Sequence, residues 1–271
     1  MSYYRALNLQ KEPFSTSPDP FFFYRSQSHD SALKRLEISI RLRRGLSLIL
    51  GDVGTGKTTL CRTLIQAFDG EDNFIFHIIL DPNYKTEFQF LSSLSKMFGV
   101  RPGFRSTLDY KDVIEKYLFQ KGVEENKTIV VLIDEGQKLN SNKLELLRTL
   151  LNYETNEYKL LQLVILAQTE LLPRLRKIKN FMDRIALKYI INPLDGAETK
   201  QMIEFRLRQA GGDGLSSLFT DEAVKLVYEH TQGYPRKIAL LCHDCLESLI
   251  IKEKPIVDGD IVNQIIQEEV R

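Results

Sequence analysis

The sequence predicts a three-layer α/β sandwich built on a parallel sheet, followed by a small all-helical domain. Short apolar segments alternate with helical patterns between about residues 30 and 191, which is typical of a parallel sheet covered by helices on both faces. Beyond Pro193 and Leu194 the strand patterns stop and only helical patterns follow. We therefore expect a lead-in at 1–29, a nucleotide-binding α/β domain at 30–194 and a helical lid domain at 195–271.

The elements follow from local patterns taken in chain order. The lead-in is rich in proline and aromatic residues, so we expect most of it to be extended. Apolar residues then recur at helical spacing, and the run at 128–133 is apolar throughout, as in a strand covered on both faces. The patterns predict strands at 46–50, 74–79, 128–133, 161–167 and 186–191, and helices at 30–42, 59–68, 85–98, 109–123, 142–154, 170–182, 196–210, 220–231, 235–252 and 258–269.

Composition is that of an ordinary globular protein. Hydrophobic residues make up 43% of the 271 positions and charged residues 27%, and the net charge of +1 gives no overall attraction to nucleic acid or anionic lipid. No run of 18 apolar residues exists, and the N-terminus lacks the apolar core of a signal peptide. We expect no transmembrane segment and a cytoplasmic location.

The three cysteines are Cys61, Cys242 and Cys245. An odd number in a chain of this length favours a reducing compartment over a disulfide framework. The spacing of Cys242 and Cys245 would also suit half a zinc site or a redox pair. Because no second pair lies within metal-ligand spacing and the flanks read as apolar helix, we expect both to fill a helical core.

A glycine-rich loop follows the first predicted strand. Residues 51–58 match the phosphate-loop pattern G-x-x-x-x-G-K-[ST], in which backbone N–H groups converge on nucleotide phosphates. Lys57 would reach the β- and γ-phosphates, where it also serves catalysis, and Thr58 would ligate Mg²⁺. We therefore predict a nucleoside triphosphate bound by Gly51, Asp52, Val53, Gly54, Thr55, Gly56, Lys57, Thr58 and Thr59.

Two acidic residues end the apolar strand at 128–133. Ligands of open α/β sheets gather at the carboxyl ends of the strands, so Asp134 is placed to hold Mg²⁺. Glu135 can polarise a water molecule for attack on the γ-phosphate. The alternative is a solvated turn after a buried strand, which the phosphate loop upstream makes the weaker interpretation.

Gln168 follows the strand at 161–167 and could detect whether the γ-phosphate is present. The alternative is a capping residue at a strand end, a role that suits Thr169 better.

Two arginines complete the predicted site. Arg236, in the sequence Gly-Tyr-Pro-Arg, opens the third helix of the lid and could fold back onto the γ-phosphate of its own subunit. Arg184 lies just before the last strand, too far along the fold to reach its own nucleotide, so it would reach that of a neighbour. For each, the alternative is a surface salt bridge.

These features together resemble an AAA+ ATPase, and more narrowly the general secretion pathway protein A family. That family has ATPases beside type II secretion, mannose-sensitive pilus and exopolysaccharide loci. The sequence departs from it in having Ala167 where glycine is usual, and in ending without the membrane span and peptidoglycan-binding domain of members that act on the cell wall. The residues that carry the resemblance are Tyr4, Pro13-Phe14, Pro18-Asp19-Pro20, the aromatic run to Tyr24, His29, 51–58, 134–139, 167–171, Arg184-Ile185 and 233–236.

The resemblance implies an enzyme that hydrolyses ATP with Mg²⁺ and assembles in the presence of ATP into a homo-oligomer, a ring. It implies a protein partner in a secretion, pilus or polysaccharide-export machinery whose assembly the ATPase drives or gates, and a peripheral position at the inner membrane. Two alternatives stay open. One is a DNA-associated AAA+ regulator of transposition, for which the basic clusters at 41–44 and 174–179 could track a phosphate backbone. The other is a slow, ATP-gated protein-binding switch.

Overall fold

The computed structural model describes residues 3–104, 106–212, 214 and 217–269. The ends of the predicted lead-in and lid domain, at 1–2 and 270–271, and residues 213 and 215–216 of the lid lie outside the described residues. The strands are β1 Leu46–Leu50, β2 Phe74–Ile79, β3 Thr128–Ile133, β4 Leu161–Ala167 and β5 Ile185–Ile190. The α-helices are α1 Tyr3–Ala6, α2 Gln27–Arg41, α3 Lys57–Gln66, α4 Glu87–Met97, α5 Thr107–Phe119, α6 Ser141–Leu150, α7 Leu172–Arg176, α8 Gly196–Gln209, α9 Asp221–Thr231, α10 Pro235–Ile251 and α11 Gly259–Glu269. Shorter turns of 3-10 or π helix are η1 Pro20–Phe22, η2 Gln120–Glu124, η3 Gly136–Lys138, η4 Thr169–Leu171 and η5 Met182–Arg184.

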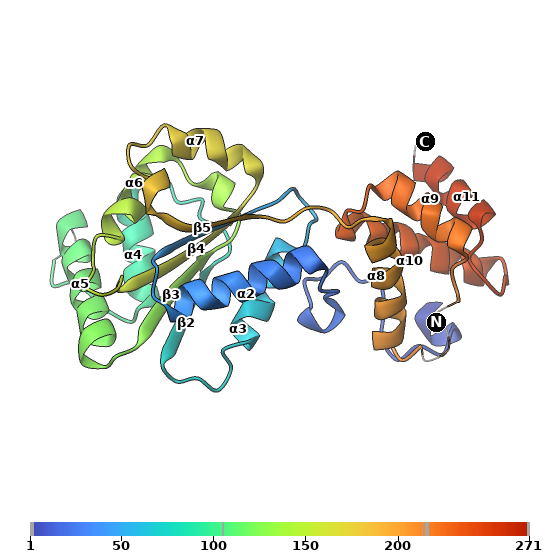
Figure 1. Ribbon diagram of the computed structural model, residues 1–271, viewed down its shortest axis with the longest axis horizontal. Coiled ribbons are helices and arrows are strands. Elements are labelled where there is room, and N and C mark those ends of the chain that lie inside the picture. The colour runs from blue at the N-terminus through green and yellow to red at the C-terminus, as the bar shows by residue number, and fades with distance from the viewer. Residues whose placement is uncertain (1–2, 105, 213, 215–216, 270–271) are drawn as a thin grey trace. The chain divides into compact units, whose positions relative to one another are not determined.

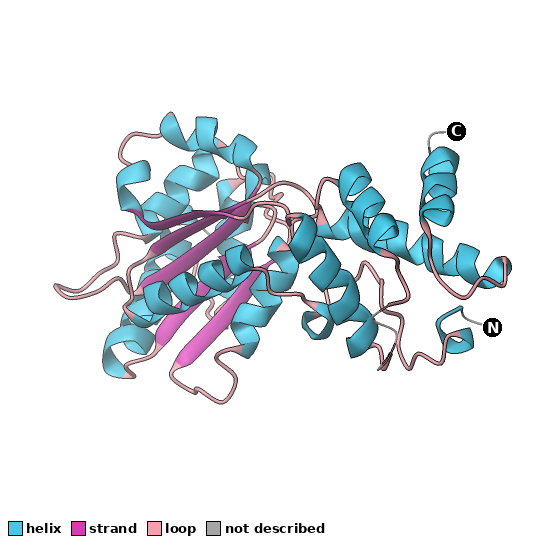
Figure 2. Cartoon of the chain, turned by 45° about the vertical axis from the view of Figure 1, so that its right-hand side comes forward, coloured by secondary structure: helices cyan, strands magenta, loops and turns pink. Residues whose placement is uncertain are grey.

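The five strands form one parallel sheet in the order β2-β3-β4-β1-β5 (Figures 1 and 2). Strand β1 lies between β4 and β5, and β3 lies between β2 and β4. The carboxyl ends of β1, β3 and β4 therefore meet at one edge of the sheet, which is where ligands of open α/β sheets bind. The predicted parallel sheet is confirmed.

Helices cover both faces of the sheet. Alternate strand residues such as Leu48, Val131 and Ile165 share a buried cluster with α4, α5, α6 and α7. The residues between them, such as Ile49 and Val130, are also fully buried, and α2 and α3 lie along that other face (Figure 1). Burial on both faces explains why the central strands read as continuous apolar runs.

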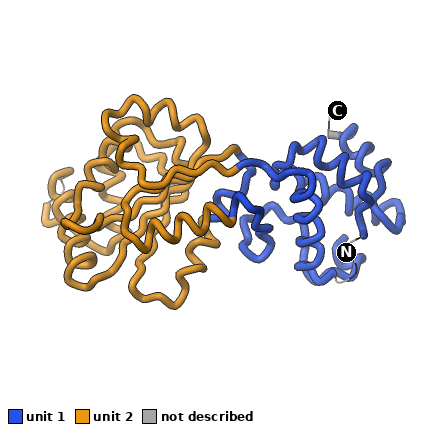
Figure 3. The backbone as a smooth tube through the Cα atoms, viewed as in Figure 1, with its two compact units in different colours: residues 1–29, 53–60, 192–271 blue, residues 30–52, 61–191 orange. Residues whose placement is uncertain are grey.

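The chain divides into two compact units (Figure 3). One contains the sheet and consists of residues 30–52 and 61–191; the other consists of residues 1–29, 53–60 and 192–271. The boundaries predicted from sequence were 1–29, 30–194 and 195–271, and this division stays a prediction. Within the second unit, the lead-in contributes Phe14 and Phe22 to the core of α8, α9, α10 and α11.

All three cysteines are free and buried. Cys242 and Cys245 lie in α10 and belong to the core of the helical unit, as the spacing predicted. Full burial raises the pKa of the Cys242 thiol, which disfavours the thiolate that metal binding or redox chemistry would need.

Two stretches differ from the predicted elements. The helix predicted at 170–182 is replaced by η4 and the short α7, and the chain then turns with Asn180 in a left-handed conformation, at a φ of 60°. An L-residue in that region cannot continue a right-handed helix. The lead-in, expected to be mostly extended, contains α1 and η1, where the Asp19 side chain accepts from the N–H of Phe21 at 2.9 Å.

Candidate nucleotide-binding site

The phosphate loop has the backbone that its glycines permit. Gly54 and Gly56 have φ values of 83° and 91°, which side chains disfavour. The loop ends at Lys57, the first residue of α3, so backbone N–H groups at the helix N-terminus point into it. Thr55 is fully buried and Lys57 is only 8% exposed. The loop from residue 53 to 60 belongs to the helical unit.

Within that unit, a buried histidine of the lead-in holds the loop. His29 is 1% exposed, and its Nε2 lies 2.8 Å from the carbonyl oxygen of Thr55. Because a carbonyl can only accept, Nε2 carries the proton, and Nδ1 accepts from the Ser26 hydroxyl at 2.8 Å. A Cβ at Gly56 would lie 3.2 Å from His29 Nε2 and 3.3 Å from the Phe23 ring. In the sequence, His29 is only one of the residues that carry the family resemblance, and this supporting role was not predicted.

The Gly-Tyr-Pro-Arg turn also contacts the loop within the helical unit. The backbone N–H of Arg236, the second residue of α10, donates to the carbonyl of Gly54 at 3.2 Å. Gly233 has a φ of 73°, and a Cβ there would fall 1.8 Å from the carbonyl oxygen of Leu194. The glycine is therefore required, and it fixes where the exposed Arg236 side chain starts. Contact of Arg236 with the γ-phosphate stays a prediction.

The acid pair lies at the end of β3, as predicted. Asp134 is 3% exposed, and its Oδ1 accepts the N–H of Glu135 at 2.8 Å. Burial and, next, the charge of Asp134 raise the pKa of Cys61 to about 12, which keeps that thiol neutral beside the carboxylate. Glu135 adopts a left-handed conformation, with φ 52° and ψ 36°. Such a strained backbone persists only where the surrounding structure holds it, and residues of this kind are concentrated at functional sites.

The sequence analysis gave no role to Gln137, yet its side chain joins two strand ends. Its Nε2 donates to Glu135 Oε2 at 2.7 Å, and its Oε1 accepts the backbone N–H of Gln168 at 3.2 Å. Arg174 of α7 donates to the carbonyls of Gln137 and Leu139. The only signal in the sequence was the position of Gln137 two residues after Glu135.

The structure thus places Gln168 beside the loop that carries Glu135, as its position at a strand end predicted. Its role as a γ-phosphate sensor stays a prediction. The alternative of a capping residue is not seen: η4 begins at Thr169, Gln168 occupies the preceding position, and no side chain caps this turn. Thr169 therefore does not have the role that its sequence position suggested.

Arg184 is far from this edge of the sheet. It ends η5, directly before β5 begins. Since β5 runs parallel to β1, the start of β5 lies at the opposite edge from the ends of β1, β3 and β4. The charge of Arg184 lowers the pKa of Glu145 on α6, after the larger effect of the hydrogen bond from Arg148. The structure does not bring Arg184 to Asp134 and Glu135.

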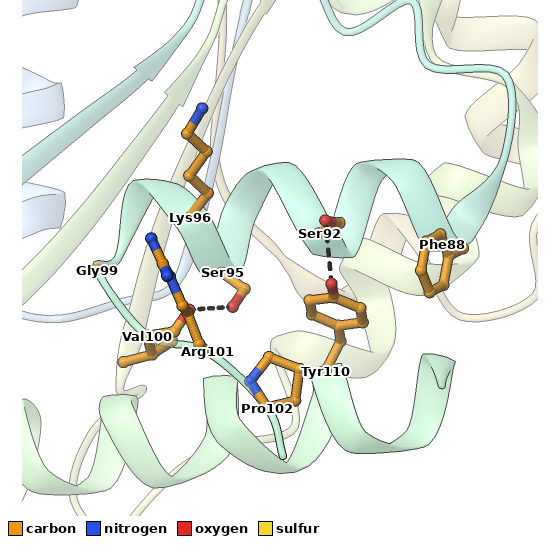
Figure 4. Close-up of a pocket in the computed structure, with 9 residues that line it drawn as sticks. All are labelled: Phe88, Ser92, Ser95, Lys96, Gly99, Val100, Arg101, Pro102 and Tyr110. Carbon is orange, nitrogen blue, oxygen red and sulfur yellow. Dashed lines mark hydrogen bonds between the residues drawn. The ribbon is translucent and has the colours of Figure 1, made fainter. Parts of the chain in front are cut away.

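A separate depression of about 620 Å³ lies between α4 and α5. Figure 4 shows Lys96 and Arg101 on one side of it, and the Ser92 hydroxyl donating to the Tyr110 hydroxyl at 3.2 Å. No described carboxylate lines it, and neither does any residue predicted to bind nucleotide. We therefore do not assign it to the nucleotide site. Its lining residues are Phe88, Ser92, Ser95, Lys96, Gly99, Val100, Arg101, Pro102 and Tyr110.

Comparison with known families agrees with this arrangement. A family model described as an AAA domain matches residues 40–175, which contain the phosphate loop, the acid pair and Gln168. The chain belongs to the AAA domain family. This AAA protein is also 35% identical over 263 residues to general secretion pathway protein A of Aeromonas hydrophila, which confirms the resemblance seen in the sequence. The match covers 96% of this chain and 47% of that protein, so the chain spans about half the length of its relative.

Solved structures share the fold of this AAA protein. The Aeropyrum pernix ORC2 protein in ADPNP and ADP complexes aligns with a TM-score of 0.70 and 17% identity, over 96% of this chain and 72% of that one. Drosophila ORC bound to DNA aligns with a TM-score of 0.71 and 20% identity, over 100% and 66%. At these identities the likeness concerns the fold alone. In the part of the chain that the structure describes, no helix is long and apolar enough to span a membrane.

Proposed function

We propose that this protein binds ATP together with Mg²⁺ and hydrolyses ATP to ADP and phosphate. The observation that carries the proposal is the acid pair Asp134-Glu135 at the end of β3, in a chain whose β1 leads into a complete phosphate loop. Lys57 would bind the β- and γ-phosphates, and Glu135 would orient the attacking water. Arg236 and Gln168 would respond to the γ-phosphate.

The residues present suit Mg²⁺. Asp134 offers a carboxylate that is almost fully buried, and Thr58 offers a hydroxyl in the first turn of α3. Oxygen ligands of this kind are the ones that Mg²⁺ prefers. When bound, the ion would neutralise charge on the phosphates, while the chain's own task would be to hold the nucleotide and exclude free water.

Two substitutions separate binding from hydrolysis. Lys57→Ala should abolish ATP binding measured by calorimetry with Mg²⁺, because the phosphate loop loses the ammonium group that would bind the β- and γ-phosphates. Glu135→Gln should bind ATP as the wild type does and release phosphate at least about a hundredfold more slowly. Normal phosphate release by Glu135→Gln would refute the role of Glu135. Absence of any heat with ATP and Mg²⁺ for the wild type would refute the proposal as a whole.

The finer proposal concerns what hydrolysis is used for. The likeness to general secretion pathway protein A supports a role in driving or gating the assembly of a secretion, pilus or polysaccharide-export machinery, through a protein partner. We propose that the protein acts as an ATP-dependent homo-oligomer in the cytoplasm, peripherally at the inner membrane. Light scattering of Glu135→Gln with and without ATP tests this: a larger particle with ATP is expected, and a monomer in both conditions would contradict it.

A DNA-associated role is the second candidate, supported by the fold shared with a DNA-bound ORC structure. Several arginines of the two basic clusters are engaged within the chain. Arg41 pairs with Glu37 and Glu71, and Arg174 donates to η3 and the residue after it. With fewer cations left for phosphates, we expect weak duplex binding in the presence of ATP, with a shallow dependence on salt. Tight ATP-dependent filaments on DNA, seen by electron microscopy, would favour the DNA role.

A further inference from the structure

The side chain of Gln137 connects Glu135 to the end of the neighbouring strand β4. We propose that Gln137 is a positioning residue that sets the orientation of the Glu135 carboxylate and makes it depend on the position of residues 168–171, which connect β4 to α7. This inference rests on the proposed ATP hydrolysis.

The hydrogen bonds fix which way the amide of Gln137 points. The backbone N–H of Gln168 can only donate, so the atom 3.2 Å from it is the amide oxygen. The amide nitrogen must then face Glu135, and it lies 2.7 Å from Oε2. A carboxylate can only accept, so both bonds hold in one amide orientation and fail in the flipped one. The bridge therefore transmits the position of the Gln168 backbone to the Glu135 carboxylate.

The main chain around Gln137 is fastened to the same part of the fold. Arg174 of α7 donates to the carbonyl of Gln137 at 2.7 Å and also to that of Leu139. A Cβ at Gly136 would lie 2.4 Å from Ile165 Cγ2, so the loop packs directly on β4. Side chain and backbone are thus both anchored on β4 and α7. A shift of that connection would carry the loop with it.

Glu135 needs such support because its backbone is strained. A left-handed conformation is costly for a glutamate, so the surrounding structure must hold it in place. Gln137 occupies Oε2, whereas Oε1 makes no hydrogen bond to any described residue. The bridge thus leaves one oxygen for a water molecule while it fixes the plane of the carboxylate. A general base in the wrong position by about 1 Å can cost about a hundredfold in rate.

Two pairs of variants test the bridge from its two ends. Gln137→Ala should lower kcat about 10–100-fold with ATP affinity unchanged, because the carboxylate loses its orientation and the phosphate loop does not. Gln66→Ala, at the exposed end of α3, is the matched control and should keep the wild-type rate. In the background of Glu135→Gln, Gln137→Ala should cause no further loss. An additive loss in the double variant would overturn the proposal.

The other pair acts on the backbone N–H of Gln168. Gln168→Pro removes this donor, and the native φ of −77° is one that proline adopts. Gln168→Ala removes the same side chain but keeps the donor. We expect the proline variant to be at least about tenfold slower than the alanine variant at similar thermal stability. Equal rates would overturn the dependence on the β4 end.

A measurement without turnover separates this inference from the proposed function. In protein labelled with ¹⁵N-glutamine, the side-chain amide signal of Gln137, assigned by its loss in Gln137→Ala, should shift in Glu135→Gln but stay unchanged in Glu145→Gln. If the wild type hydrolyses no ATP yet this signal shifts, the proposed function fails and the bridge stands. An unchanged signal in Glu135→Gln would overturn the bridge even in an active enzyme.

Discussion

Loss of the buried His29 imidazole should weaken both the stability of the protein and the binding of ATP by the phosphate loop. We expect His29→Ala to lower the free energy of unfolding by about 1–3 kcal/mol, because the fully buried Thr55 carbonyl would lose its donor. The loop would also become less ordered, so ATP should bind several-fold more weakly. Calorimetric titration with ATP and denaturant unfolding measure the two effects.

His29→Gln is the informative companion variant, since an amide can still donate to the carbonyl. It should recover part of the lost affinity. Gln66→Ala, at an exposed position on α3, should change neither quantity. Equal ATP affinity in His29→Ala and the wild type would show that the lead-in does not support the loop.

Arg184 provides a test of contact between subunits. Because it lies at the opposite sheet edge from the strand ends, Arg184→Ala should leave ATP affinity intact and lower hydrolysis by about 10³-fold, as loss of an arginine supplied in trans does. Mixing Arg184→Ala with Lys57→Ala should restore some phosphate release, because each variant supplies the group that the other lacks. Failure of the mixture to recover activity would mean that Arg184 does not act across subunits.

Residues differ in how well sequence alone identifies them. The phosphate loop and the Asp-Glu pair could be predicted because their chemistry depends on a fixed local spacing after a strand. Gln137, Arg174 and the supporting role of His29 could not, since each acts through a partner at least 26 positions away along the chain. Only the folded chain brings those partners together.

Helices and strands also differ in how well the sequence alone predicts them. The central strands β1, β3 and β4 were predicted well because a strand covered on both faces must be apolar throughout. The helix predicted at 170–182 was wrong beyond Arg176, where Asn180 takes a left-handed conformation and Phe181 turns into the core. Helical spacing of apolar residues does not reveal where tertiary packing ends a helix.

The close packing of η3 on β4 should make the protein sensitive to any side chain added at Gly136. Gly136→Ala should destabilise the protein by about 1–3 kcal/mol, because the new methyl group would overlap Ile165 and approach Ala167 to 3.2 Å. The loop must then move away from β4, and hydrolysis should fall with stability. Thermal unfolding and phosphate release measure both. Gly103→Ala is the matched control, since that glycine also lacks a positive φ and has nothing within 4 Å of the added Cβ. Equal thermal stability of Gly136→Ala and the wild type would contradict the close packing.

For the whole molecule, contiguity in sequence is a poor guide to the units. A linear division assigns the lead-in, the phosphate loop and the lid helices to three places, whereas one compact unit contains all of them. Arg206 of α8 illustrates the reason: it is half-buried and donates to the carbonyl of Ser15 in the lead-in. Such a contact between residues 191 positions apart leaves no periodic pattern in the sequence.

Each of the two units should lose stability as the pH falls, because each contains a histidine that is wholly or partly buried. Burial lowers the pKa of His29 in the helical unit and of His77 in the sheet unit below the ordinary value of 6.5. The unfolded chain therefore binds protons at a pH where the folded chain does not, so stability is greatest above pH 6.5 and falls as the pH drops through the window below it. Carboxylates with a lowered pKa, such as Glu71, change the stability only when the pH falls below their ordinary pKa of 4.5, so they do not contribute to the decline above that value. We expect the urea-unfolding free energy to decline from pH 7.5 to 5.5. His29→Gln should reduce the pH dependence of the unfolding free energy of the lid helices. His77→Phe should reduce that of the sheet. An undiminished slope in the double variant would mean that other groups cause the decline.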